Sequence, residues 1–314
     1  MSLREGDGRG FATTLGVAAI VLWASTVAFG RSLTTQLGPL HGAAAVYVVS
    51  AVFSLCVLGV RPARAREALR LPPKYLFGCG ALFVVYAICL YLALGLASGS
   101  QQAIEVGTIN YLWPAATVVL SVPILGQRAR WTIVPGTLAA LAGIILATLP
   151  PGQWSAQIFI DTLRTNWIPY VLALVAALDW ALYSNLSRRW ASGAGAGAVP
   201  LFMVVTASVM APLALLQPAA DIQWSPRLVF ELAYLGLFPT AIAYAFWEVA
   251  MRRGNLLLVA NLSFFIPLMS AAIAAFYLHT APRIELWLGC ALVSVGAWIC
   301  HHSLTDPDEP RHCA

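Results

Sequence analysis

Residues 74–96 read KYLFGCGALFVVYAICLYLALGL and carry one charged side chain, that of Lys74 at the first position. An apolar helix of roughly 20 residues crosses the ~30 Å hydrocarbon layer of a bilayer. Backbone polar groups cannot stay unpaired in lipid, so an apolar segment of this length is expected to be helical. The stretch therefore predicts one membrane-spanning helix.

Nine further apolar runs surround this one, and only short polar connectors separate most of them. The runs are too long to be the strands of a soluble β or α/β fold. The chain is 60% hydrophobic and 10% charged, with a mean hydropathy of +0.79, which excludes an ordinary soluble domain. We therefore expect an all-α integral membrane protein with ten transmembrane helices at residues 12–34, 40–60, 74–96, 101–123, 131–149, 168–190, 198–217, 227–250, 257–278 and 285–302.

The N-terminus offers an alternative interpretation, because Arg4 and Arg9 precede an apolar stretch as they would in a secretory signal. That stretch runs from Phe11 to about Thr34, which is too long for a typical signal core, and further spans follow it. We interpret it as the first transmembrane helix.

The net charge of +5 is a topology signal rather than a sign of nucleic-acid binding. If ten spans alternate from a cytoplasmic N-terminus, all but four of the 18 Lys and Arg residues fall on the cytoplasmic side. Positive residues concentrate on the cytoplasmic side of membrane proteins. We therefore predict that both termini lie in the cytoplasm. The four exceptions are Arg31, Arg164, Arg227 and Arg283.

The sequence shows no sign of enzymatic or metal chemistry. Its six cysteines form no C-x-x-C pair, and His41 and His279 have no second ligand at metal-binding spacing. No H-E-x-x-H motif, nucleophile elbow or nucleotide-binding loop is present. We expect no enzyme activity, no metal, no cofactor, no nucleic acid and no obligate protein partner.

The two halves of the chain resemble each other. Trp23 and Arg31 recur 157 positions later as Trp180 and Arg188. Four more positions recur with a displacement of 153: Pro114, Arg130, Gly136 and Gly143 match Pro267, Arg283, Gly289 and Gly296. A chance match in a Gly- and Ala-rich chain is the alternative.

Each half contains five expected spans, so the second half would lie in the membrane upside down relative to the first. Inverted repeats of this kind are typical of transporters, whose substrate site lies at the repeat interface near the midplane. We expect a first repeat at 11–149, a periplasmic connector at 150–165, a second repeat at 166–302 and a cytoplasmic tail at 303–314, around a central cavity.

Several aromatic residues fall near the middle of their spans, although Trp and Tyr normally mark the membrane interfaces. An indole N–H or a phenol O–H at that depth requires a partner. A shared, water-containing cavity would supply one; ordinary packing against backbone carbonyls is the alternative. The residues are Trp23, Tyr86, Tyr111, Trp113, Trp180 and Tyr244.

Three prolines also lie inside expected spans. A proline in a helix removes the hydrogen bond to the carbonyl four residues earlier. Pro114 and Pro267 would free the carbonyls of Asn110 and Ser263, which are themselves repeat equivalents and candidate ligands for a substrate ammonium or a water. Simple kinking is an equal alternative for each. Pro239 is a candidate gating hinge.

Few ionisable groups fall within the spans. Asp179, beside Trp180, is a candidate for either the cavity or helix packing, since carboxylates inside membranes are usually functional. Glu105 lies early in its span, and Glu248 precedes Arg252 by four residues, which favours a local helix pair.

These features resemble the EamA-type, ten-helix members of the drug/metabolite transporter superfamily. The resemblance rests on AALDWALYSNLSRRW (176–190), AYLGLFPTAIAYAFWEVAMRRGN (233–255) and QAIEVGTINYLWP (102–114), of which the last is similar to the aromatic amino-acid exporter branch. It implies export of amino acids from the cytoplasm by alternating access, with Trp23, Tyr86, Tyr111, Trp113 and Trp180 lining the cavity.

One departure from that family concerns proton coupling. Members often carry Glu after Leu-Gly at the ends of the fourth and ninth helices, where this chain has LGQ at 125–127 and LHT at 278–280. The departure argues against proton coupling through a carboxylate at these positions.

We expect an exporter of aromatic and other apolar or neutral amino acids with broad specificity. Efflux of hydrophobic cations is the first alternative, and a membrane protein that transports nothing is the second.

Overall fold

The computed structural model describes residues 2–148, 166–191, 198–218, 222–253, 259 and 262–305. Within these residues the fold is helical, apart from one antiparallel pairing of β1 (Arg128–Ala129) with β2 (Leu304–Thr305). The expected connector at 150–165 and most of the expected tail at 303–314 lie outside the described residues. The first residues of that expected tail form β2, which pairs with β1 in the loop before α8.

An apolar helix occupies each of the ten expected spans. In the first half these are α1 (Ser2–Ala24) with α2 (Thr26–Leu37), α3 (Pro39–Val60), η1 (Lys74–Cys79) with α5 (Gly80–Leu96), α6 (Ser100–Asn110) with α7 (Trp113–Leu125), and α8 (Ile133–Thr148). In the second half they are α10 (Ile168–Trp190), α11 (Val199–Leu215), α12 (Pro226–Leu237) with η2 (Phe238–Ile242) and α13 (Ala243–Arg253), α15 (Ile266–Tyr277) and α16 (Ile284–His302).

Seven of the helical segments in the described part of the chain are long and apolar enough to cross a membrane. The other three expected spans contain the shorter apolar helices Ile133–Ala147, Val199–Leu215 and Ile266–Tyr277. Two details differ from the sequence prediction. The first helix begins at Ser2 rather than near residue 12, and α4 (Pro62–Leu69) lies in a region expected to be a loop.

Several spans are interrupted near their middle. In the first span a turn at Ser25 interrupts the helix. In the fourth span a turn at residues 111–112 separates α6 from α7, whose second residue is Pro114. Pro267 likewise stands in the first turn of α15, after a turn at residues 264–265. Proline fits the first turn of a helix because the N–H it lacks has no partner there. These prolines therefore start new helices, whereas the sequence suggested kinks inside continuous ones.

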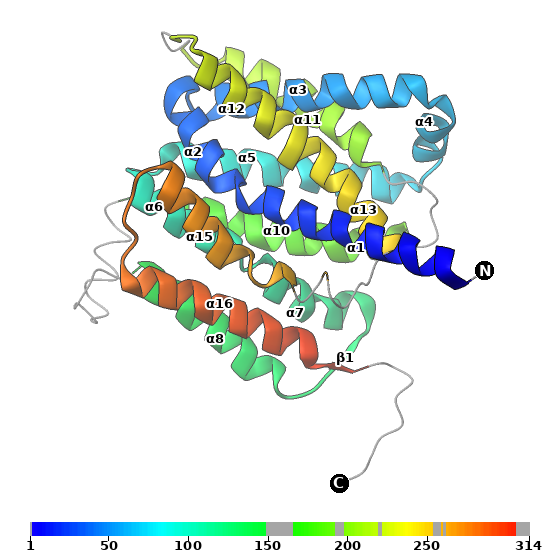
Figure 1. The fold of residues 1–314 in the computed structure, drawn as a ribbon, viewed down its shortest axis with the longest axis vertical. Coiled ribbons are helices and arrows are strands. Elements are labelled where there is room, and N and C mark those ends of the chain that lie inside the picture. The colour runs from blue at the N-terminus through cyan, green and yellow to red at the C-terminus, as the bar shows by residue number, and fades with distance from the viewer. Residues whose placement is uncertain are drawn as a thin grey trace.

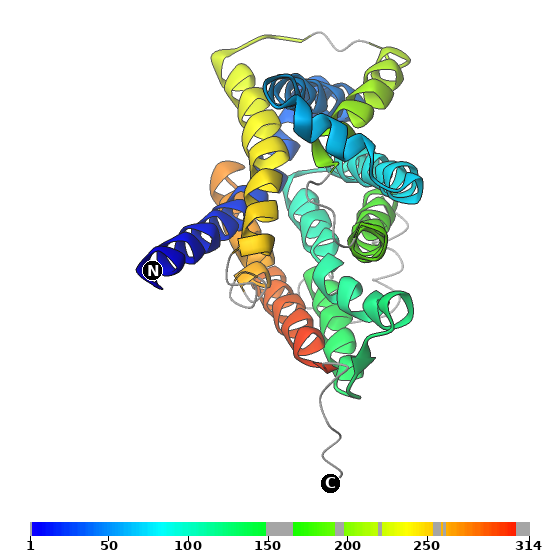
Figure 2. The same ribbon diagram turned by 90° about the vertical axis from the view of Figure 1, so that its right-hand side faces the viewer.

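The described elements of the two halves interlock rather than standing apart (Figures 1 and 2). α3 packs against α11, and α8 packs along α16. α1 packs against α13, and α10 packs against α5, which is the same pairing with the two halves exchanged.

Glycines allow the closest of these contacts, between α8 and α16. A Cβ atom on Gly289 would lie 2.5 Å from the carbonyl oxygen of Gly143, and one on Gly296 would lie 2.6 Å from that of Gly136. Small residues let the backbones of membrane helices approach each other closely. The four glycines are the repeat-related ones, so each half supplies two of them.

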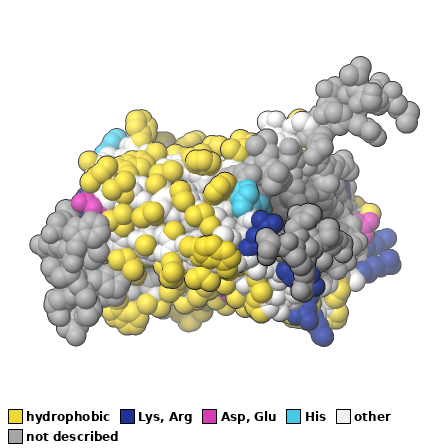
Figure 3. All heavy atoms as spheres, turned by 90° about the horizontal axis from the view of Figure 1, so that it is seen from below, with side chains coloured by type: hydrophobic (Ala, Val, Ile, Leu, Met, Phe, Trp, Pro, Cys, Tyr) yellow, Lys and Arg dark blue, Asp and Glu magenta, His cyan; other side chains and the backbone are white. Residues whose placement is uncertain are grey.

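The molecular surface has the pattern expected for a membrane protein. Figure 3 shows a hydrophobic band across the middle, with Lys and Arg gathered at one end. That end is the one at which α1 begins and at which α4 and β1 lie in Figure 1. Large apolar side chains of the long helices, such as Leu138 and Val52, are more than half exposed in the isolated chain.

Substitution of Gly289 by alanine should destabilise the fold, because the added Cβ has no room against α8. Overpacking of this kind costs about 1–3 kcal/mol. We expect a lower thermal midpoint for Gly289→Ala in detergent. Gly59→Ala is the matched control, since a Cβ on Gly59 meets nothing within 4 Å. Equal midpoints for the two variants would contradict the close contact of α8 with α16.

Candidate functional site

A cavity of about 470 Å³, including its opening, lies between helices of the two halves. The side chains lining it come from α1, α2, α5, α6, α7, α10, α13 and α15 and the turn after α6. They are Trp23, Thr26, Val27, Tyr86, Leu90, Asn110, Tyr111, Trp113, Trp180, Tyr244 and Ile266.

Seven of the nine residues proposed from the sequence as substrate ligands line this cavity, among them all six mid-span aromatic residues. The other two, Asp179 and Ser263, are buried but do not line it. In the described part of the chain, no group of three or more His, Cys, Asp or Glu side chains could hold a metal ion.

The aromatic walls contain two equivalent pairs. The rings of Trp23 and Tyr244 meet at 5.2 Å between centroids, and those of Trp180 and Tyr86 meet at 4.8 Å. Trp23 and Trp180 are repeat equivalents, and Tyr86 and Tyr244 lie 158 positions apart, close to the displacement of the repeat. Trp180 also approaches Tyr244 at 5.7 Å, which joins the two pairs.

The polar ends of two aromatic side chains bond to the backbone near helix interruptions. The indole of Trp23 donates to the carbonyl of Pro239 at 3.0 Å, within η2. The hydroxyl of Tyr111 donates to the carbonyl of Trp23 at 3.2 Å, two residues before the break at Ser25. For Trp23 and Tyr111, backbone carbonyls therefore supply the partners of the polar groups, which is the alternative to a water-containing cavity that the sequence analysis considered.

Asn110 offers an unused acceptor at the cavity wall. It is the last residue of α6 and is 4% exposed, and its Oδ1 atom has no hydrogen-bond partner among the described residues. A buried polar atom without a partner loses the free energy of its bonds to water. The sequence pointed to the main-chain carbonyl of Asn110, whereas the structure draws attention to its side-chain oxygen.

The carboxylates within the described parts of the spans do not line the cavity. Asp179 is buried on α10, which packs against α5, and its Oδ2 atom has no hydrogen-bond partner among the described residues. Glu105 accepts hydrogen bonds from Arg283 at 2.8 Å and from Tyr170 at 2.6 Å, so it forms a buried ion pair away from the cavity. The side chain of Glu248 lies outside the described residues.

Sequence reasoning missed four lining residues, namely Thr26, Val27, Leu90 and Ile266. Helical spacing would have found three of them, because Thr26 and Val27 follow Trp23 by three and four positions and Leu90 follows Tyr86 by four. Ile266 is the repeat equivalent of Trp113, 153 positions later.

Comparison with known proteins gives consistent matches over most of the chain. The EamA-like transporter family matches residues 10–149 and again residues 167–300. The aromatic amino acid exporter YddG of Salmonella typhimurium is 36% identical over 92% of this chain and 96% of its own length. The exporter of the same name from Escherichia coli is 34% identical over the same shares. A solved crystal structure superposes with a TM-score of 0.65 at 30% identity, over 92% of this chain and 95% of the other.

The cavity should be reachable by small water-soluble reagents. We expect Thr26→Cys, in a variant whose native cysteines are replaced, to react with a small thiol reagent when the protein is solubilised in detergent. Ala19→Cys should stay unreactive, since Ala19 is fully buried one turn before the cavity. Equal protection of both cysteines would show that the space around Thr26 is closed to water.

Proposed function

Because the chain belongs to the EamA-like transporter family, we propose that it exports aromatic and other apolar amino acids through this cavity by alternating access. The observation that carries the proposal is the cavity wall, in which six aromatic side chains from both halves surround one space. The printed names of the two exporters above support the same class of substrate.

The proposed architecture is ten transmembrane helices in two inverted repeats, 11–149 and 166–302. The exchange symmetry of the helix pairings supports it, as do the glycines that α8 and α16 contribute equally to their contact. The family's two separate matches fall on nearly the same halves. In such transporters, one repeat moves against the other around a fixed central site.

The proposed location is the bacterial inner membrane, with both termini in the cytoplasm. The basic end of the molecule, at which α1 begins, supports this orientation (Figure 3). The opposite end, where α2 ends and α12 begins, then faces the periplasm.

Recognition of the substrate combines two kinds of contact. Aromatic faces attract a desolvated ammonium with about 2 kcal/mol and also stack against aromatic rings. The free Oδ1 atom of Asn110 is a suitable acceptor for the same ammonium. Because apolar walls distinguish one methylene by only about 1–3 kcal/mol, several amino acids should be carried.

Efflux of hydrophobic cations remains the second candidate, since aromatic walls also bind them. No carboxylate lines the described cavity, which favours a zwitterion that brings its own negative charge.

Counterflow in proteoliposomes tests the proposal. We expect uptake of radiolabelled tryptophan, competition by several apolar amino acids, and little competition by hydrophobic cations. Trp180→Ala should raise the half-saturation concentration by about tenfold through loss of stacking and cation–π contact. Trp131→Ala is the matched control, because Trp131 is 79% exposed outside the cavity. Undiminished transport by Trp180→Ala would reject this cavity as the substrate site.

Asn110→Leu separates recognition of the ammonium from recognition of the ring. A hydrogen bond to a charged group is worth about 1.5–3 kcal/mol, so competition by tryptophan should weaken by about tenfold or more. Competition by indole-3-propionate, which lacks the amino group, should not change. A parallel loss for both compounds would mean that Asn110 acts only by shaping the cavity.

A further inference from the structure

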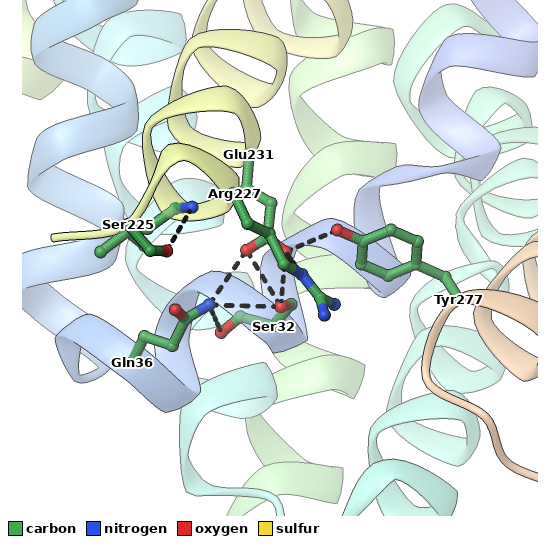
Figure 4. A network of polar contacts seen from close by, with 7 residues as sticks. Ser32, Gln36, Ser225, Arg227, Glu231 and Tyr277 are labelled. Atoms are coloured by element: carbon green, nitrogen blue, oxygen red, sulfur yellow. Dashed lines mark hydrogen bonds and ion pairs between the residues drawn. The ribbon is translucent and has the colours of Figure 1, made fainter. Parts of the chain in front are cut away.

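A third buried carboxylate, that of Glu231, is the centre of a polar cluster outside the cavity (Figure 4). Glu231 lies on α12 and is 0% exposed. Ser32 donates to its two oxygens at 2.9 and 3.0 Å, and Gln36 donates at 3.1 Å. Arg227 and Tyr277 donate to Oε1 at 2.8 and 2.5 Å. We call these five residues the Glu231 cluster.

The cluster joins three helices of different repeats. Ser32 and Gln36 belong to α2, Glu231 and Arg227 to α12, and Tyr277 to α15. A layer of rings lies beside it, in which Phe29 of α2 stacks on Tyr277 at 4.3 Å and meets Tyr234 of α12 at 4.5 Å. The same three helices therefore meet twice, once through rings and once through the carboxylate.

The order of residues along α2 places the ring layer and the Glu231 cluster between the cavity and one end of the molecule. Thr26 and Val27 line the cavity, Phe29 belongs to the ring layer, and Ser32 and Gln36 belong to the cluster. At 1.5 Å per residue, Ser32 lies about 9 Å beyond Thr26 along the helix. In the orientation proposed above, this end faces the periplasm.

The donors of the cluster favour an ionised carboxylate, since the N–H groups of Arg227 and Gln36 can only donate to it. Four side chains donate to Glu231, and an ionised carboxylate accepts at both oxygens, whereas a protonated one must itself donate from one of them. Bonds to a charged acceptor are also roughly twice as strong as neutral ones. Addition of one proton to Glu231 would therefore weaken the contacts of α2 and α15 to α12 together.

The groups around the carboxylate are few. Arg227, from its own helix, and Tyr277, from α15, are the charged and titratable groups that face it. α2 contributes the neutral Ser32 and Gln36, and no contact from α3 to this carboxylate occurs among the described residues. The side chain of Arg227 is 59% exposed, so the cluster borders the solvent at that end.

We propose that Glu231 is a proton-binding site on the periplasmic side, and that its protonation releases the contact between α2, α12 and α15 that closes the cavity there. The proposal rests on alternating access as proposed above. A ligand shifts a two-state equilibrium toward the state that binds it better. The contacts of the closed state favour the ionised carboxylate, so a proton favours the state open to the periplasm, and acidification outside should increase the population of that open state.

A second carboxylate, that of Glu105, also joins helices at the end of the molecule that we propose to face the periplasm. Glu105 binds Arg283 and Tyr170, which ties α6 to α10 and to the segment before α16. The repeat equivalent of Arg283 is Arg130, but the position 153 residues after Glu105 is Leu258. At the repeat-related positions, Arg130 and Leu258, the sequence therefore lacks the acidic partner of this ion pair.

The test measures access to the cavity from outside. Thr26→Cys in the cysteine-replaced background is labelled with a membrane-impermeant maleimide in right-side-out vesicles, at several external pH values with the labelling time corrected for reagent reactivity. We expect faster labelling as the external pH falls. With Glu231→Gln added, labelling at neutral pH should be about tenfold faster, as expected for loss of a hydrogen bond to a charged group, and independent of pH.

Glu285→Gln is the matched control, because it removes a carboxylate at the same end of the molecule outside the cluster. It should leave both the rate and the pH dependence unchanged. Tyr277→Phe removes one donor while keeping the ring, and should raise the neutral-pH rate in the same direction, which covers the case of a poorly folding Glu231 variant. A wild-type rate and pH profile in Glu231→Gln, or in Tyr277→Phe if Glu231→Gln does not fold, would overturn the proposal.

The labelling readout uses no substrate. If the wild-type protein carries no amino acid in counterflow but labelling responds to Glu231→Gln, the proposed function fails and the proton site stands. If transport is normal and labelling ignores both pH and the variants, the proton site fails alone.

Discussion

The constraint on which this structure depends is that the backbone of a membrane-embedded segment must find hydrogen-bond partners within the protein. Most of the chain meets it with apolar helices. Several exceptions, namely the break at Ser25, the turn at 111–112 and the π-helix η2, lie close to the cavity, whereas η1 lies at the end of its span. Side chains from the other half bond to carbonyls there, as Trp23 does to Pro239. The irregular backbone is therefore tolerated where it borders the site.

The same constraint explains why the two halves cannot be independent units. α8 and α16 approach so closely that a methyl group on Gly289 would collide with the backbone of Gly143. Each half also supplies one Trp of an aromatic pair and the Tyr of the other. The cavity thus exists only where the halves meet, and a relative movement of the halves must change its shape.

The sequence predicted the positions of the spans and the aromatic wall because both depend on local information. Apolar length marks a span, and a Trp or Tyr at the wrong depth marks a cavity. Glu231 lies in a predicted span but was not singled out, since its partner Ser32 is 199 residues away and no local pattern connects them. Asp179 attracted attention for the same reason that Trp180 did, yet a turn of 100° per residue points the two neighbours in different directions. Only Trp180 reaches the cavity.

Two buried polar side chains, those of Asn110 and Glu231, differ in a way that suits the role proposed for each. The Oδ1 atom of Asn110 lacks a partner, which is unfavourable in the empty cavity and becomes favourable when a donor arrives. The oxygens of Glu231 have more donors than a neutral acid can use, which holds helices together only while the charge persists. An unsatisfied acceptor suits a group that meets a passing substrate. A saturated anion suits a contact that must be firm in one state and released in another.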